Sequence, residues 1–168
     1  MRIFLGLGSN EGSRLENLLL GCESIKGLTD TRIINISHVY ETPPLYNEKL
    51  SNFYNLVIEI NSKLNPAELL NKLKKIELLF GRDLSNGHNL SRKLDIDILA
   101  YGHKQVNKKE LVIPHSKIFE RKFVLQPWSD IAEDFILIGM NKTIKSLLSE
   151  TTDSSKIHRV DLPVKIVL

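Results

Sequence analysis

Residues 92–99 read RKLDIDIL, and the interpretation of the whole chain starts from this stretch. Leucine and isoleucine alternate with Asp95 and Asp97, a period of two that predicts a β-strand with one apolar and one acidic face. Successive side chains point to opposite sides of a strand, so we expect both carboxylates on one face, about 6–7 Å apart. Two carboxylates held in this way suit a hard divalent cation such as Mg²⁺.

A basic residue strengthens this interpretation. Arg92 precedes Asp95 by three residues, and its planar guanidinium group can grip a phosphate at two points. Because phosphates commonly accompany Mg²⁺, the stretch predicts a strand that binds metal and phosphate. The alternative is an antiparallel strand whose charges simply face solvent, as the polar faces of half-exposed sheets do.

The composition is ordinary for one globular domain spanning residues 1–168, with residues 136–168 as a C-terminal extension. The net charge of +3 suits an anionic ligand and does not require nucleic acid. Cys22 is the single cysteine, which precludes an internal disulfide, and we expect it to pack in a helix. With no signal-peptide pattern and no run of 18 apolar residues, we expect a cytoplasmic monomer without a membrane segment.

Periodicity predicts elements in the order β-α-β-β-α-β, with additions at the C-terminus. The expected strands cover residues 2–7, 31–40, 53–60, 92–99 and 110–113, and the expected helices cover 14–26, 66–80 and 143–149. Ser13 with Glu16 predicts a capping box for the first helix, and Asn65 predicts a cap for the second. The order indicates an α+β, ferredoxin-like sandwich in two layers, with helices on one face of a largely antiparallel sheet.

Three other segments are candidate walls of a binding pocket. Residues 42–44, Thr-Pro-Pro, are rigid and either form a wall against a flat ligand or simply end a strand. Phe53 and Asn55 share one strand face, where they either stack on and hydrogen-bond a heterocycle or serve as a core ring and a turn amide. Residues 81–90 predict a mobile loop that could close over the acidic strand.

Two ionisable residues are further candidates. His115 directly follows a proline and is therefore held in a loop, where an imidazole or imidazolium can donate to phosphate. Glu77 lies near the C-terminal end of the second helix, where the helix dipole does not favour an acid. We therefore expect Glu77 to have a partner.

Taken in order, these segments resemble the family of 6-hydroxymethyl-7,8-dihydropterin pyrophosphokinase, an enzyme of folate biosynthesis. The resemblance covers roughly residues 1–135 and rests on a combination of motifs: Gly8-Ser9-Asn10, Tyr40-Glu41-Thr42-Pro43-Pro44, Phe53-Tyr54-Asn55, Glu77 and Arg82, Arg92-x-x-Asp95-x-Asp97, Pro114-His115 and Arg121-x-Phe123. It implies a ferredoxin-like αβα fold and transfer of pyrophosphate from ATP to the pterin hydroxymethyl group, with release of AMP.

The resemblance also implies a role for each matching residue. Asp95 and Asp97 would bind two Mg²⁺ ions that bridge the ATP phosphates, and the implied catalytic residues are Arg82, Arg92, Asp95 and Asp97. The residues implied to bind ATP are Glu77, Arg92, Ile98, His115 and Arg121. Those implied to bind the pterin are Thr42, Pro43, Leu45, Phe53, Asn55 and Phe123, with Phe53 and Phe123 on either side of the ring.

The chain departs from the family pattern in the loops. The family often has Arg-x-Arg where this chain has Arg82-Asp83-Leu84, and Gly-Pro with a nearby Trp where residues 88–91 read HNLS. Glu110 and Ser116 replace a basic and an aromatic residue. Three alternatives stay open: a catalytically impaired relative, a ferredoxin-like nucleic-acid-binding module, whose stacking motif is missing here, and a two-metal phosphotransferase with another acceptor.

Overall fold

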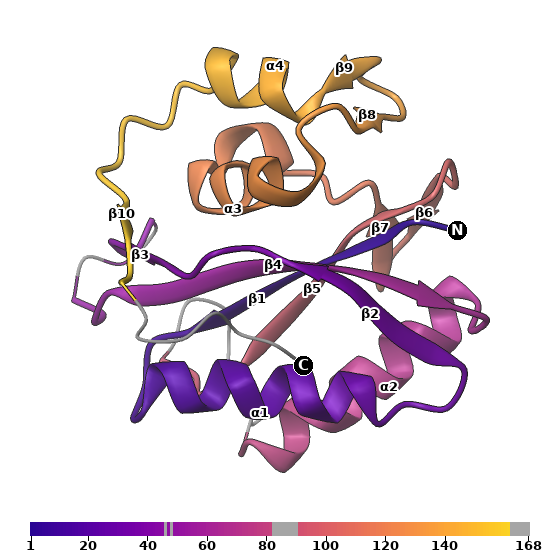
Figure 1. The fold of residues 1–168 in the computed structure, drawn as a ribbon, viewed down its shortest axis with the longest axis horizontal. Helices are drawn as coiled ribbons and strands as arrows, with labels where there is room; N and C mark the ends of the chain where they lie inside the picture. Colours follow the sequence, from indigo (N-terminus) through magenta and orange to yellow (C-terminus); the bar gives the residue numbers. More distant parts are fainter. Residues whose placement is uncertain (46, 48, 82–90, 162–168) are drawn as a thin grey trace.

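The computed structural model describes residues 1–45, 47, 49–81 and 91–161. An antiparallel sheet lies at its centre (Figure 1). The strands of this sheet are β1 (Ile3–Ser9), β2 (Thr31–Ile36), β3 (Tyr40–Thr42), β4 (Phe53–Ser62), β5 (Asp95–Tyr101) and β10 (His158–Arg159). They follow the order β10-β3-β4-β1-β5, and β2 also pairs with β4. The acidic stretch is therefore a strand, β5, and it pairs with β1.

Helices cover both faces of this sheet (Figure 1). On one face lie α1 (Arg14–Lys26) and α2 (Pro66–Leu79); on the other lies α3 (Lys122–Ala132), with α4 (Ile144–Glu150) packed against it. The short elements are the 3-10 helix η1 (Ile118–Glu120) and the strand pairs β6 (Val106–Lys108) with β7 (Leu111–Ile113) and β8 (Ile136–Leu137) with β9 (Lys142–Thr143). The expectation of two layers, drawn from the order of elements, is wrong, whereas the αβα arrangement implied by the family resemblance is confirmed.

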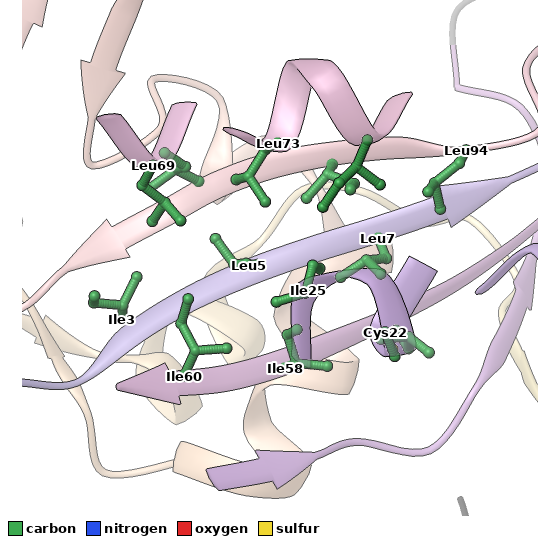
Figure 2. Packing of buried hydrophobic residues seen from close by; sticks show 14 of the residues in the cluster. Ile3, Leu5, Leu7, Cys22, Ile25, Ile58, Ile60, Leu69, Leu73 and Leu94 are labelled. Carbon is green, nitrogen blue, oxygen red and sulfur yellow. The ribbon is translucent and has the colours of Figure 1, made fainter. Parts of the chain in front are cut away.

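Two hydrophobic cores explain the extra layer. Alternate residues of β1, such as Leu5, point toward α1 and α2 and pack with Cys22, which is fully buried as predicted (Figure 2). Phe4 points to the other side, where its ring lies 5.0 Å from that of Trp128 in α3 and 4.7 Å from that of Phe135. Because β1 is apolar on both sides, both faces of the sheet need a cover.

The strand expected over residues 31–40 is interrupted between β2 and β3, which both pair with β4. At the interruption, the hydroxyl of Ser37 accepts a hydrogen bond from Val57 N (2.9 Å), and Ser37 N donates to Val57 O (2.9 Å). The hydroxyl takes the place of a backbone carbonyl, so the regular ladder stops there. Counted as one broken strand, β2 and β3 complete the β-α-β-β-α-β order of the ferredoxin-like fold.

The two predicted caps have different outcomes. Asn65 forms the predicted cap of α2: its Oδ1 accepts hydrogen bonds from Ala67 N and Glu68 N, both at 3.0 Å. The capping box predicted at Ser13 is wrong, because the Ser13 side chain makes no capping hydrogen bond. The predicted C-terminal helix is confirmed as α4. Within the described ranges, every helix is too short or too polar to cross a bilayer.

Candidate active site

A cavity of about 390 Å³ lies on the sheet face that α3 covers. Its floor comes from β1, β4 and β5, and its walls come from residues 42–45, 47, 50, 115–117, 121, 123 and 124. Most of the predicted site residues line it together, namely Thr42, Pro43, Leu45, Phe53, Asn55, Arg92, Asp95, Asp97, His115, Arg121 and Phe123. The structure therefore brings segments from distant parts of the chain into one site.

The acidic pair lies on the floor of this cavity. Asp95 and Asp97 line it, with side chains 28% and 40% exposed, while Ile96 between them is buried against the α1 and α2 side. This confirms that the two carboxylates share one strand face. Their position inside a cavity argues against the alternative of charges that merely face solvent.

Glycines on the neighbouring strand keep this floor open. Gly6 pairs with Asp97 and Gly8 with Asp95 in the ladder between β1 and β5. A Cβ atom at Gly8 would lie only 2.9 Å from Asn55 Oδ1. Gly8 therefore permits the close approach of the Asn55 amide to the strand.

Each aspartate has an arginine beside it. Arg92 Nη1 lies 2.7 Å from Asp95 Oδ1, and Arg121 Nη1 lies 3.3 Å from Asp97 Oδ2. The backbone of Arg92 is fixed by Asn10, whose Oδ1 accepts from Arg92 N (2.8 Å) and whose N donates to Arg92 O (3.1 Å). This role of Asn10 was not predicted from the sequence, although Asn10 belongs to the Gly8-Ser9-Asn10 motif.

The surroundings of Asp97 disfavour the charged form of its carboxylate when no cation is bound. Burial, together with the neighbouring charge of Asp95, raises the pKa of Asp97 to about 6, against the opposing effect of Arg121 and Arg92. A cation bound between the two carboxylates would relieve this repulsion. The electrostatics therefore favour a metal ion at this position.

His115 is neutral at physiological pH, because burial and the charge of Arg121 lower its pKa to about 4. Lys117 N donates to His115 Nδ1 (3.2 Å), and the other ring nitrogen, Nε2, faces the acidic pair. That nitrogen lies 3.9 Å from Asp97 Oδ2 and 3.4 Å from Arg121 Nη1. Of the two predicted forms, the imidazole is therefore the one present, with Nε2 beside the acidic pair.

The other end of the cavity is suited to a flat ring. Asn55 Nδ2 donates to Thr42 Oγ1 at 2.7 Å, and both residues are buried. This contact fixes the orientation of the amide, whose remaining donor and acceptor positions can read a heterocycle. Phe53 from β4 and Phe123 from α3 line the same cavity, although 70 residues separate them in the sequence. Their position on either side of a bound ring stays a prediction.

Of the predicted site residues that the structure describes, Glu77 and Ile98 do not line the cavity. Glu77 is 2% exposed in α2 and has the partner that its position predicted, because its Oε1 accepts from Ile96 N at 2.8 Å. Ile98 is buried in the core against α1 and α2. The assignment of both residues to ATP stays a prediction. Arg82 lies outside the described residues, as does the expected lid from residue 82 to 90.

The donor set fits Mg²⁺ that arrives with phosphate ligands. Mg²⁺ in nucleotide sites is held by one or two carboxylates, and substrate phosphates and water complete its coordination. In the part of the chain that the structure describes, no group of three or more His, Cys, Asp or Glu side chains could hold a metal alone. Arg121 Nε is buried and has no hydrogen-bond partner among the described residues, as expected of a donor reserved for an anionic ligand.

Comparisons with known proteins identify the family of the chain. Residues 4–133 match the family model for 7,8-dihydro-6-hydroxymethylpterin-pyrophosphokinase. The chain is 36% identical over 160 residues to the pyrophosphokinase of Methylorubrum extorquens, covering 95% of this chain and 99% of that protein. It is 36% identical over 155 residues to the folic acid synthesis protein fol1 of Pneumocystis carinii, covering 90% of this chain but only 20% of that protein.

A solved structure agrees on the fold. The Plasmodium falciparum HPPK-DHPS structure with pteroate superimposes on 88% of this chain with a TM-score of 0.71 and 19% identity, and 42% of that chain is covered. The chain thus spans less than half of this neighbour and about a fifth of the Pneumocystis relative. The ferredoxin-like fold is confirmed, and the chain belongs to the 7,8-dihydro-6-hydroxymethylpterin-pyrophosphokinase family.

Proposed function

We propose that the protein transfers pyrophosphate from ATP to the hydroxymethyl group of 6-hydroxymethyl-7,8-dihydropterin and releases AMP. One observation carries the proposal: a single cavity has an acidic and basic end beside an end formed by rings and an amide. Asp95 and Asp97 would hold two Mg²⁺ ions at the first end. Asn55 and Thr42 would bind the pterin at the second.

The ring end has the size and chemistry for a pterin. A volume of about 390 Å³ lies within the ~300–1,000 Å³ typical of small-molecule sites. The amide of Asn55 can bond to the polar edge of the pterin, while Phe53 and Phe123 offer ring faces for stacking. The hydroxymethyl group would then point along the floor toward Asp97.

The phosphate end supplies positioning and electrostatic stabilisation, which account for most of the rate in phosphoryl transfer. Arg92 and Arg121 bring two fixed positive charges, and neutral His115 adds a polar ring without adding charge. When bound, Mg²⁺ would shield charge on the β-phosphate and on the departing AMP. Asn10 would hold Arg92 in place through its two backbone hydrogen bonds.

The reaction balances without a covalent enzyme intermediate. The hydroxymethyl oxygen forms a bond to the β-phosphorus of ATP, and its proton passes to solvent water. The bond from that phosphorus to the oxygen bridging the α-phosphate breaks, and the electron pair leaves with AMP. The protein's task is to hold the two substrates in line.

The nucleic-acid alternative is disfavoured by the position of α3. RNA-recognition domains use an open sheet face on which bases stack. Here that face is occupied by the core around Phe4, Val57, Leu99 and Trp128. What stays accessible is the cavity at one end of the sheet, which is suited to small molecules.

The test is to incubate the protein with ATP, Mg²⁺ and 6-hydroxymethyl-7,8-dihydropterin and to separate the products by chromatography. We expect AMP and the diphosphorylated pterin in equal amounts. ADP with a monophosphorylated product would contradict the proposal. The absence of both nucleotide products at high enzyme concentration would favour the impaired relative.

A further inference from the structure

The C-terminal segment 151–160, here called the strap, joins two walls of the cavity. It leaves α4, passes the N-terminus of α3 and ends beside β3 (Figure 1). At one end Thr151 Oγ1 donates to Phe119 O (2.7 Å). At the other end β10 pairs with β3, and Val160 N donates to Val39 O (2.9 Å).

Within the strap, Asp153 caps α3. The side chain at the N-cap position of this helix, Arg121, makes no capping hydrogen bond. Instead Asp153 Oδ2 accepts from Lys122 N, the first residue of the helix, at 2.9 Å. A carboxylate in this place satisfies a free helix N–H and interacts favourably with the helix dipole.

The strap holds Asp153 firmly in this position. Asp153 Oδ1 accepts from Ser155 N (2.9 Å), and Asp153 N donates to Thr151 Oγ1 (3.3 Å). Lys122 Nζ donates to Ser155 O at 3.3 Å, which ties the strap to the helix a second time. These hydrogen bonds hold Asp153 in place, and Asp153 in turn holds the first turn of α3 in place.

The capped turn carries two residues of the candidate site. Arg121 directly precedes Lys122, and Phe123 directly follows it. Arg121 reaches Asp97 at the phosphate end, whereas Phe123 lines the ring end. A small shift of this turn would therefore disturb the binding of both substrates.

We infer that Asp153 is a positioning residue: by capping α3 it holds Arg121 and Phe123 where they meet the triphosphate and the pterin. This inference rests on the proposed function. Asp153 itself does not line the cavity, so it acts through its neighbours. The competing explanation is a cap that contributes to stability alone.

A matched control distinguishes the two explanations. Thr143 caps α4, where its Oγ1 accepts from Ser146 N at 3.1 Å. The helix α4 packs against α3 in the same core but contributes no residue to the cavity. Asp153→Ala and Thr143→Ala both remove one helix cap, whereas Asp153→Asn keeps one of the two acceptor oxygens.

The experiment compares these three variants with the wild type in melting temperature, kcat and KM. We expect both alanine variants to lower the melting temperature to a similar extent. Only Asp153→Ala should lower kcat/KM, by about tenfold, because small displacements of positioned groups are costly. The KM for the pterin should rise through Phe123 and kcat should fall through Arg121. Asp153→Asn should lie between the wild type and Asp153→Ala, because it keeps one acceptor and loses the charge.

Amide hydrogen exchange provides a readout that needs no activity. Val124 N and Leu125 N donate to Arg121 O at 2.9 and 3.0 Å in the first turn of α3. Asp153→Ala should accelerate exchange at these two amides, and Thr143→Ala should not. If Asp153→Ala does not fold, Thr151→Val, which loosens the strap and keeps the carboxylate, should show both effects to a smaller degree.

The inference is overturned if Asp153→Ala matches Thr143→Ala in kcat/KM, or if exchange in the first turn of α3 is unchanged. An inactive wild type would instead contradict the proposed function. The exchange measurement would still test the cap in that case. The two failures are therefore distinguishable.

Discussion

The carboxylate of Asp97 is destabilised by its surroundings in the metal-free protein, so Asp97→Asn is expected to stabilise the fold while abolishing turnover. Asparagine keeps the shape of the side chain and an oxygen that can accept from Arg121, which now lies 3.3 Å from Asp97 Oδ2. It removes the charge that burial and Asp95 disfavour. It also removes one of the two carboxylates proposed to hold Mg²⁺.

The size of the effect follows from the pKa of Asp97, which is raised from 3.8 to about 6. Each unit corresponds to about 1.4 kcal/mol, so the full shift would be about 3 kcal/mol. The side chain is 40% exposed, and solvent screening reduces this to about 1 kcal/mol. Because the folded-state pKa of this acid is raised, the cost is nearly absent at pH 4 and complete above about pH 6–7.

Thermal unfolding in EDTA at pH 7.5 and pH 4 measures this effect. At pH 7.5 the variant should melt about 2–4 °C higher than the wild type, and the difference should nearly vanish at pH 4. Mg²⁺ with a non-hydrolysable ATP analogue should stabilise only the wild type. Asp134→Asn, at an exposed aspartate outside the cavity, is the control for a general loss of negative charge. A variant that is less stable at pH 7.5, or that retains turnover, would refute the reasoning.

Three further predictions concern the neighbours of Asp97. Gly8→Ala places a Cβ atom 2.9 Å from Asn55 Oδ1 and should raise the KM for the pterin about tenfold. The affinity for ATP, measured by calorimetry, should not change. Equal losses for both substrates would contradict this prediction. With a pKa of about 4, His115 should show no imidazole titration by NMR between pH 5.5 and 8.5, whereas a midpoint near 6.5 would contradict its burial. Glu77→Ala leaves Ile96 N without its carboxylate acceptor and should lower the free energy of unfolding by about 1–3 kcal/mol in urea titrations. An unchanged unfolding free energy would show that this hydrogen bond contributes nothing.

The parts of the fold predicted from the sequence are those with a local signal. The alternation in residues 92–99 is sufficient to place Asp95 and Asp97 on one strand face, because side-chain direction depends only on the period. The cap at Asn65 was predicted for the same reason, since the asparagine, the proline after it and Glu68 are neighbours in the sequence.

Periodicity alone missed the third layer, which only the family resemblance implied, because the local signals of that layer conflict. The helix α3 contains Pro127, and proline usually ends a helix, so its apolar periodicity was not interpreted as helical. The strap has no periodicity at all, and β10 has two residues, His158 and Arg159. A segment of this kind is defined by tertiary contacts such as Asp153 with Lys122, which lie 31 residues apart.

The candidate site shows the same division. The motifs predicted which residues form the site, but they did not predict the contacts between those residues. Asn10 fixes Arg92 across 82 residues of sequence, and no local pattern predicts such a pairing. The pKa of His115 likewise depends on burial and on Arg121, which only the folded structure reveals.

The most direct test of the metal-binding proposal is a crystal structure of the protein with Mn²⁺ and an α,β-methylene analogue of ATP, with the metal located by anomalous scattering. Mn²⁺ prefers the oxygen ligands that Mg²⁺ uses. We predict anomalous peaks within about 2.4 Å of carboxylate oxygens of both Asp95 and Asp97, with the triphosphate between Arg92 and Arg121. Metal and nucleotide bound elsewhere, with the two carboxylates still paired only to their arginines, would contradict it.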